Sequence, residues 1–307
     1  MALATAHSQL AMQALAQRMT PLGAGAEAGW LPDGRLFLCH GPINLVVRAD
    51  GPSNAVKAAY ARLRSRFPGW LGALVEELPT LRTPATPSTP RGGGSIARRM
   101  TGAARAHAPQ FITPMAAVAG AVADEAIDVL GSVEELERAF VNNGGDIAVL
   151  LRPGTFLDIG VVPSLKHAIP TAAFRLRSSD PIRGIATSGW RGRSHSLGIA
   201  DAVTVLACDA ASADAAATIL ANAVNVDEPA IVRAPAAALD ERTDLGDRLV
   251  TVKVPTLSPT LVADALDAGL AEAERLQTLG LIESAALALQ GQWRIADRNL
   301  YRERIRA

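Results

Sequence analysis

Short apolar runs alternate with helices of small residues through the second half of the chain, and this alternation limits the possible folds more than any other feature. The segment 115–130 is apolar on nearly all sides, which predicts a buried helix. The order of the runs lacks the regularity of a parallel βαβ sheet, so we expect an α+β fold with mixed or antiparallel sheets and packed helices. Strands are predicted at 146–151, 157–162, 172–177, 201–208, 248–254 and 293–296, and further helices at 212–223 and 259–279.

The first half of the chain predicts a hairpin followed by a helix. Two β-rich runs, 35–39 and 43–48, flank a His-Gly-Pro turn, and a helix is expected over 52–66, stopped by Pro68 and Gly69. A proline-, threonine- and glycine-rich segment at 79–95 reads as a surface loop before a helix near 96–106. Ser132 and Glu135 match a capping box, which predicts a helix to about residue 142.

Composition excludes several classes of protein. The chain has 307 residues, enough for a substantial core, and its 30 basic and 30 acidic side chains give no net charge. This balance argues against bulk attraction to nucleic acid or to acidic membranes. The most apolar window, 111–123, is too short to cross a bilayer, and the first 19 residues make a poor signal peptide. Cys39 and Cys208 predict buried free thiols, which fits a cytoplasmic protein.

The basic residues are almost all arginines, because the chain has only three lysines. This excess fits either GC-rich coding or the use of fixed cationic groups to hold anions. Composition leaves both explanations open.

The turn at 113–120, with the sequence TPMAAVAG, introduces the apolar helix. Its proline and small residues would let a helix N-terminus approach a ligand closely, and free amides there suit an anion. A tightly packed helix of small residues explains the same pattern.

The turn at 142–146, with the sequence NNGGD, precedes a buried strand. Two glycines permit positive φ and a close backbone approach. A glycine helix stop explains them equally well, but it does not explain Asp146, whose carboxylate would need a partner at the start of a buried strand.

The loop at 184–196 gathers glycines, hydroxyls, Arg191 and Arg193. Backbone amides, short donors and fixed cations are what an oligophosphate site needs, so we interpret this loop as functional rather than as an exposed basic loop. Ser188, His195 and Asp201 occur in an order that permits a catalytic triad, but no nucleophile-elbow pattern surrounds Ser188.

Asp214 and Thr218 lie four residues apart on the expected helix at 212–223. This spacing places a carboxylate and a hydroxyl on one face, and both are oxygen ligands of the kind that Mg²⁺ takes. An acidic residue that complements the helix dipole is the simpler explanation for Asp214 taken alone.

These four turns, in this order, resemble the ApbE superfamily of flavin transferases, and more closely its functionally uncharacterised branch. The likeness runs from about residue 30 to residue 225 and is carried by TPMAAVAG, NNGGD, GIATSG (184–189) and ADAAAT (213–218). It implies an α+β architecture related to the T-fold, with a tail or helix at 1–25 and one domain of two lobes at 26–307 around a central ligand cleft.

The resemblance also implies a ligand set. Typical members bind FAD and Mg²⁺, and some transfer FMN to a threonine or serine hydroxyl of a target protein. The implied metal ligands are Asp214 and Thr218, and Ser188 and His195 are the candidates for catalysis. The residues expected around FAD, FMN or its phosphates are Thr113, Met115, Gly120, Gly144, Gly145, Asp146, Thr187, Ser188, Gly189, Arg191 and Arg193.

Two departures from the family pattern affect the expected activity. Typical transferases carry a lysine where this chain has Ala119, and a histidine followed by a proline turn where this chain has His195 and no proline. We therefore expect a protein that binds a flavin or another phosphate-bearing or heteroaromatic small molecule. Its alternatives are a non-catalytic binding protein and an enzyme of pterin-type cofactor metabolism. The helix at 259–279 could pack on its own core or on a second subunit, so a homodimer is a default expectation.

Overall fold

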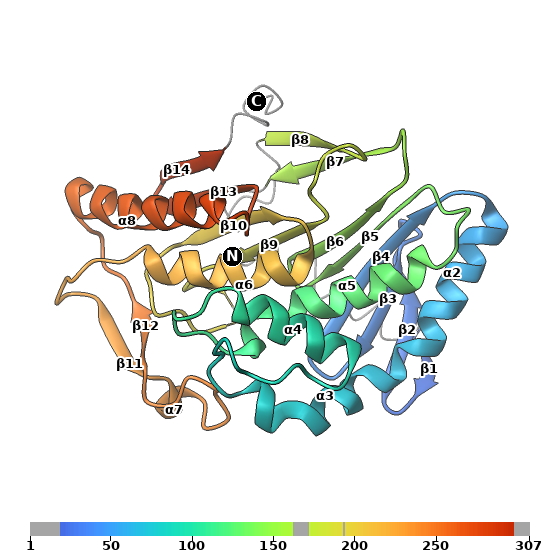
Figure 1. Cartoon of the computed structure of the whole chain (residues 1–307), viewed down its shortest axis with the longest axis horizontal. Helices are drawn as coiled ribbons and strands as arrows, with labels where there is room; N and C mark the ends of the chain where they lie inside the picture. The colour runs from blue at the N-terminus through green and yellow to red at the C-terminus, as the bar shows by residue number, and fades with distance from the viewer. Residues whose placement is uncertain (1–18, 162–171, 193, 298–307) are drawn as a thin grey trace.

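The computed structural model describes residues 19–161, 172–192 and 194–297, and its centre is one large antiparallel sheet (Figure 1). Ten strands pair in the order β1-β2-β3-β4-β5-β6-β9-β10-β13-β14, and each neighbouring pair is antiparallel. The sheet and its packed helices confirm the expected α+β class. Its strands are β1 (Thr20–Gly23), β2 (Ala26–Trp30), β3 (Leu36–His40), β4 (Ile43–Asp50), β5 (Arg138–Asn143), β6 (Asp146–Leu151), β9 (Gly184–Ser188), β10 (Ala202–Ala207), β13 (Ser284–Leu289) and β14 (Gln292–Asp297).

Helices cover one face of this sheet, and two small hairpins complete the fold (Figure 1). The hairpins are β7 (Phe156–Val161) with β8 (Ala172–Arg177), and β11 (Val232–Pro235) with β12 (Leu249–Lys253). The helical elements are α2 (Ser53–Arg66), α3 (Pro68–Leu81), α4 (Ser95–Arg105), the 3₁₀ turn η1 (Pro114–Ala117), α5 (Val118–Gly131), α6 (Ala210–Ala223), α7 (Ala236–Leu239) and α8 (Pro259–Thr278). No helix in the described part of the chain is long and apolar enough to span a membrane.

The main core lies between the sheet and the helices. Alternate strand residues such as Ala148 and Val205 face α5 and α6, which are themselves rich in buried alanine. Helix α8 buries Val262, Leu266 and Ala273 in the same core, so its apolar stripe packs within this chain. The homodimer stays a prediction.

A second, smaller core occupies the opposite face of the sheet. Val149 and Leu206 point there, because their neighbours along each strand belong to the main core. The β7–β8 hairpin covers them with Leu157 and Leu176.

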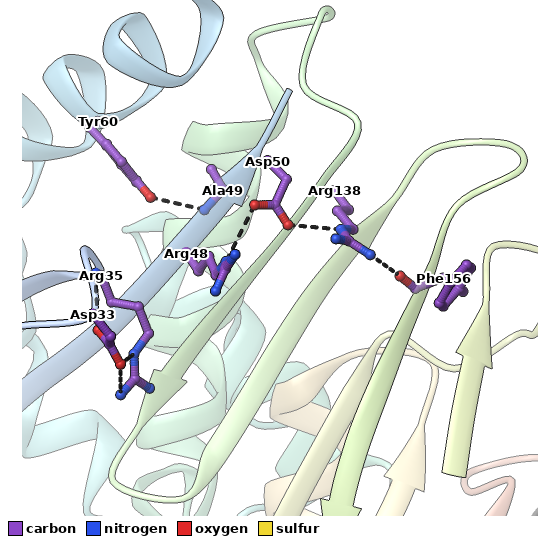
Figure 2. Close-up of polar contacts among 8 residues, drawn as sticks. All are labelled: Asp33, Arg35, Arg48, Ala49, Asp50, Tyr60, Arg138 and Phe156. Atoms are coloured by element: carbon purple, nitrogen blue, oxygen red, sulfur yellow. Dashed lines mark hydrogen bonds and ion pairs between the residues drawn. The ribbon is translucent and has the colours of Figure 1, made fainter. Parts of the chain in front are cut away.

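Figure 2 shows how polar side chains join β4, β5 and β7. The Asp50 carboxylate accepts from Arg48 Nε at 3.3 Å and from Arg138 Nε at 2.8 Å, and Arg138 Nη1 donates to the Phe156 carbonyl at 2.8 Å. The Tyr60 hydroxyl accepts the Ala49 amide at 2.9 Å and fixes α2 to β4.

The structure corrects the expected helix at 132–142. Ser132 instead ends α5, where its amide donates to the Asp128 carbonyl at 3.0 Å. Residues 138–143 form β5, paired on both sides, with Ala139 and Val141 buried in strand alternation. The capping-box pattern is local, whereas these two strand pairings depend on residues far away in the sequence.

Other differences concern the first third of the chain and the two cysteines. Helix α2 ends at Arg66 as expected, but Pro68 and Gly69 also begin α3, which continues past Pro79 to Leu81. Residues 20–25, which we assigned to a tail, form β1 and the turn into β2, and residues 1–18 lie outside the described part. Both cysteines are free, but Cys208 is exposed and Cys39 is only partly buried, so the expectation of two buried thiols is wrong.

Candidate functional site

Helices α5 and α6 cross at Gly120, at a distance that excludes a side chain. A Cβ atom on Gly120 would lie 2.1 Å from the Ala210 carbonyl oxygen, well inside contact distance. Tight packing therefore accounts for the small residues of the 113–120 turn. The same approach points the Gly120 amide at the Asp214 carboxylate, whose Oδ2 accepts it at 3.0 Å. The anion at this helix N-terminus is thus a side chain of α6.

Asp214 and Asp146 form a pair of carboxylates held by main-chain amides. Asp214 accepts from Gly120, and the buried Asp146 accepts the Thr187 amide through Oδ1 at 3.3 Å. Burial raises the pKa of Asp214 well above its usual range, and the neighbouring Asp146 carboxylate raises it further, while the amides of Gly120 and Ala119 oppose this shift. The charge of Asp146 therefore acts on Asp214 in the folded protein.

The turn between β5 and β6 brings Asp146 to this place. Gly144 and Gly145 have φ of +68° and +122°, values that residues with a side chain rarely adopt. The Gly145 amide donates to Asn142 Oδ1 at 2.9 Å. Asn143 Nδ2 donates to the Ala119 carbonyl at 3.0 Å and anchors the turn to the start of α5. A helix stop does not explain these glycines, because they close a β-hairpin.

The end of β9 contributes the third segment of the site. The exposed Thr187 hydroxyl lies 2.9 Å from the Thr204 hydroxyl, and Ser188, partly buried, pairs with Val203 in the ladder. Direct hydrogen bonds or charge contact therefore bring together Thr187, Asp146, Gly120 and Asp214.

Arg191, in the loop that follows, is not a free cation. Arg191 Nε donates to Asp201 Oδ1 at 2.8 Å, and the Arg191 guanidinium lies 4.3 Å from the Trp190 ring. Asp201 Oδ2 accepts the Gln290 amide at 2.7 Å, so the Asp201 carboxylate serves Arg191 and Gln290 rather than His195. His195 is exposed, and this arrangement gives no support to the triad. Arg193 lies outside the described residues.

Asp214 and Thr218 lie one turn apart on α6, and both are partly buried. Thr113 reaches a different partner, because its hydroxyl donates to the Asp244 carboxylate in the loop before β12. Met115 packs partly buried against the main core, which is a structural role. No group of three or more His, Cys, Asp or Glu side chains arranged to hold a metal occurs among the residues that the structure describes.

Sequence reasoning missed Asp124. This carboxylate accepts the amides of Ala210 and Ala211 at 2.9 and 2.8 Å and so binds the N-terminus of α6 to α5. Burial raises its pKa to about 7, although the two amides oppose the shift. A lone acid on an otherwise buried helical face was the available signal, since such a charge needs partners.

Comparison with known proteins gives one family over most of the chain. A family model described as "AbpE bacteria" matches residues 28–295. Curated relatives carry the name UPF0280 protein. One from Methanosphaerula palustris is 43% identical over 41% of this chain and 52% of its own length, and one from Archaeoglobus fulgidus is 39% identical over 39% and 47%. A third, from Methanopyrus kandleri, is 34% identical over 55% and 66%. The chain thus spans about half the length of the first curated relatives that it matches.

Two solved structures are distantly similar. The apo flavinyl transferase ApbE of Pseudomonas stutzeri is 15% identical, with 89% of this chain and 94% of that chain covered and a TM-score of 0.42. An ApbE protein of Thermotoga maritima is 20% identical over 60% of this chain and 50% of its own, with a TM-score of 0.35. Scores this low carry no residue-level information about the site.

Proposed function

The chain belongs to the AbpE bacteria family, and on this premise we propose that it is a flavin-transferase-like protein that binds FAD or FMN together with Mg²⁺. One observation carries the proposal. Asp146 and Asp214 come from separate motifs, both accept main-chain amides, and the charge of Asp146 raises the pKa of Asp214. A cation bound beside both carboxylates would lower the free-energy cost of keeping them ionised.

The donor set fits a hard divalent cation. Asp214, Asp146 and the Thr218 hydroxyl offer oxygen only, and Mg²⁺ is commonly held by one or two carboxylates with water and phosphate oxygens. Bound there, Mg²⁺ would neutralise charge on a diphosphate. The residues of this chain would orient the ligand: the close crossing at Gly120 fixes α5 against α6, and the β5–β6 turn fixes Asp146.

A flavin or another phosphate-bearing ligand would occupy the space beside the Gly144–Gly145 turn and Thr187. The transfer of FMN to a hydroxyl is the finer part of the proposal, with Ser188 and His195 as candidates for catalysis. Ala119 stands where the resemblance implies a lysine, and its carbonyl is used by Asn143. This observation favours, as a second candidate, a protein that binds the ligand without transferring FMN.

Thermal unfolding with FAD, with and without Mg²⁺, tests the proposal. A ligand at about one hundred times its Kd stabilises a protein by about 2.7 kcal/mol, which for a chain of this size raises Tm by about 4 °C. We expect this rise for the wild-type protein only when Mg²⁺ is present, and not for Asp214→Asn. The matched control is Asp264→Asn, an exposed aspartate on α8, which should respond like the wild type.

The outcomes separate the parts of the proposal. No response to FAD or FMN under any metal condition rules out the flavin ligand. An equal rise for Asp214→Asn rules out the proposed metal ligand. Release of AMP from FAD in the presence of a serine- or threonine-containing acceptor supports transfer, whereas binding without release supports the second candidate.

A further inference from the structure

An open pocket of about 430 Å³ lies next to the start of η1. It is lined by Pro84, Phe111 and the loop 244–248. The hydrogen bond from Thr113 to Asp244 joins this loop directly to the segment that leads into α5. None of these loop residues was singled out by the sequence.

Arg248 gives this pocket its distinctive chemistry. Its guanidinium carbon lies 3.5 Å from the centre of the Phe111 ring, so the cation covers one face of an aromatic side chain. Arg248 is exposed, and no ion pair joins it to a carboxylate within the described ranges. The outer face of the guanidinium is therefore available for a second planar group, since guanidinium planes stack on heteroaromatic rings.

One short segment of the chain leads from the pocket to the Gly120 amide that holds Asp214. Thr113 immediately precedes η1, and η1 continues into α5, where the Gly120 amide holds Asp214. The rise of this 3₁₀ turn and of the first residues of α5 spans no more than about 12 Å. A dinucleotide such as FAD is long enough to cover a span of this size.

A larger pocket of about 640 Å³, lined by residues of α5, β6 and the start of α6, offers less to a ligand. Its charged groups are already used within the fold: Asp124 accepts two amides of α6, Arg183 donates to three carbonyls, and Arg99 pairs with Asp128. The smaller pocket has an exposed cation, and its loop is hydrogen-bonded to the segment that leads into α5.

We propose that the pocket beside Phe111 is the ring-binding end of the ligand cleft. A planar heteroaromatic ring stacks on the outer face of Arg248, and its N–H edge donates to the carboxylates of Asp244 or Asp247. Purines, pterins and isoalloxazines share this chemistry. The proposal rests on the proposed function, because the diphosphate end of the same ligand is taken to lie at Asp146 and Asp214.

Isothermal titration in the presence of Mg²⁺ tests this assignment, with FAD, FMN, ADP, 6-hydroxymethylpterin diphosphate and inorganic pyrophosphate as probes. Arg248→Ala and Phe111→Ala should weaken at least one ring-bearing probe tenfold or more, while pyrophosphate binding stays within twofold of wild type. Arg248→Gln, which keeps a planar group, should recover part of the loss. Arg242→Ala is the control, because this exposed arginine of the same loop region does not line the pocket.

The probes that lose affinity identify the ring. A loss shared by FAD and ADP but not by FMN indicates adenine, a loss shared by FAD and FMN but not by ADP indicates isoalloxazine, and a loss confined to the pterin probe indicates a pterin. Unchanged affinity for every ring-bearing probe overturns the assignment, and so does an equal loss for pyrophosphate, because Arg248 would then act on phosphate alone.

Asp214→Asn in the same titrations separates this inference from the proposed function. If Asp214→Asn abolishes binding and the pocket variants do not change it, the proposed function stands and the ring pocket is wrong. If the pocket variants lose the ring-bearing probes while Asp214→Asn binds normally, the ring pocket stands and the metal site is wrong. A wild-type protein that binds none of the probes overturns both.

Discussion

The free energy of unfolding of the wild-type protein should fall as the pH rises from about 4 to about 7, because of Asp124. Replacing Asp124 with asparagine should remove this pH dependence. Asp124 is almost fully buried, at 4% exposure, and it joins α5 to the N-terminus of α6 through two amides. Its pKa in the folded protein is about 7, against an ordinary value of 3.8. The folded protein therefore favours the protonated form of this carboxyl group more strongly than the unfolded chain does.

The pH window and the magnitude follow from this difference. Between about pH 4 and about pH 7 the folded protein keeps a proton that the unfolded chain has already released, so the free energy of unfolding falls as the pH rises. The contribution is complete below the pKa of the unfolded chain and is lost as the pH passes through the pKa of the folded protein. At about 1.4 kcal/mol for each pKa unit, the full difference is about 4 kcal/mol.

Urea denaturation at about pH 4, 5.5 and 8 measures the effect. Asp124→Asn carries a pH-independent cost of about 1–2 kcal/mol, because one of the two α6 amides loses its acceptor. We expect the variant to be clearly less stable than wild type at the lowest pH, and the gap to close or reverse at the highest. Asp128→Asn, an exposed carboxylate on the same helix, should show no such trend. A gap between wild type and Asp124→Asn that stays constant across the three pH values would refute the reasoning.

Three further substitutions test other contacts. Asp50→Asn removes the negative charge shared by two partly exposed ion pairs and should lower the free energy of unfolding by about 1 kcal/mol, less at high salt, in urea titrations. Gly120→Ala pushes a Cβ atom against a carbonyl oxygen of α6. It should lower the free energy of unfolding by about 1–3 kcal/mol and abolish the Mg²⁺-dependent rise in Tm. The control is Gly102→Ala, which has open space around it and should be neutral or stabilising. The Glu77 carboxylate accepts the amides of Gly93 and Gly94, just before α4, at 2.7 and 2.8 Å. Glu77→Gln keeps only one acceptor for these two amides and should speed their hydrogen exchange. Unchanged exchange would show that the carboxylate does not hold the loop before α4.

The parts of the fold that could be predicted are those that local pattern determines. Continuous apolar runs predict the strands at 146–151 and 202–207 and the buried helix α5, because apolar side chains favour burial wherever they occur. β5 could not be found in this way, because Ser132 and Glu135 imitate a helix start, and only pairing with β4 and β6 makes 138–143 a strand. α3 was hidden by Pro68, which ends one helix but is also suited to the first turn of the next.

The candidate site also has residues that the sequence predicts and residues that it does not. Gly120, Asp146, Thr187 and Asp214 stand in recognisable motifs, and the structure brings them together. Their exact roles toward a ligand stay predictions. Asp124 was missed because its partners lie 86 and 87 residues away in the sequence, so no local motif indicates these hydrogen bonds. The glycines and hydroxyls around Arg191 suggest a phosphate ligand, whereas the structure shows its guanidinium engaged by Asp201 and Trp190.

Two of the donors that hold Asp146 and Asp214 are peptide amides, those of Thr187 and Gly120, and every residue type except proline supplies such an amide. A point mutation elsewhere in the cleft cannot remove these two hydrogen bonds without also moving a strand or a helix. The position of the acidic pair is therefore inherited with the fold, whereas the side chains that would choose a ligand are not. Substitutions of side chains that would contact a ligand therefore leave these two main-chain hydrogen bonds in place.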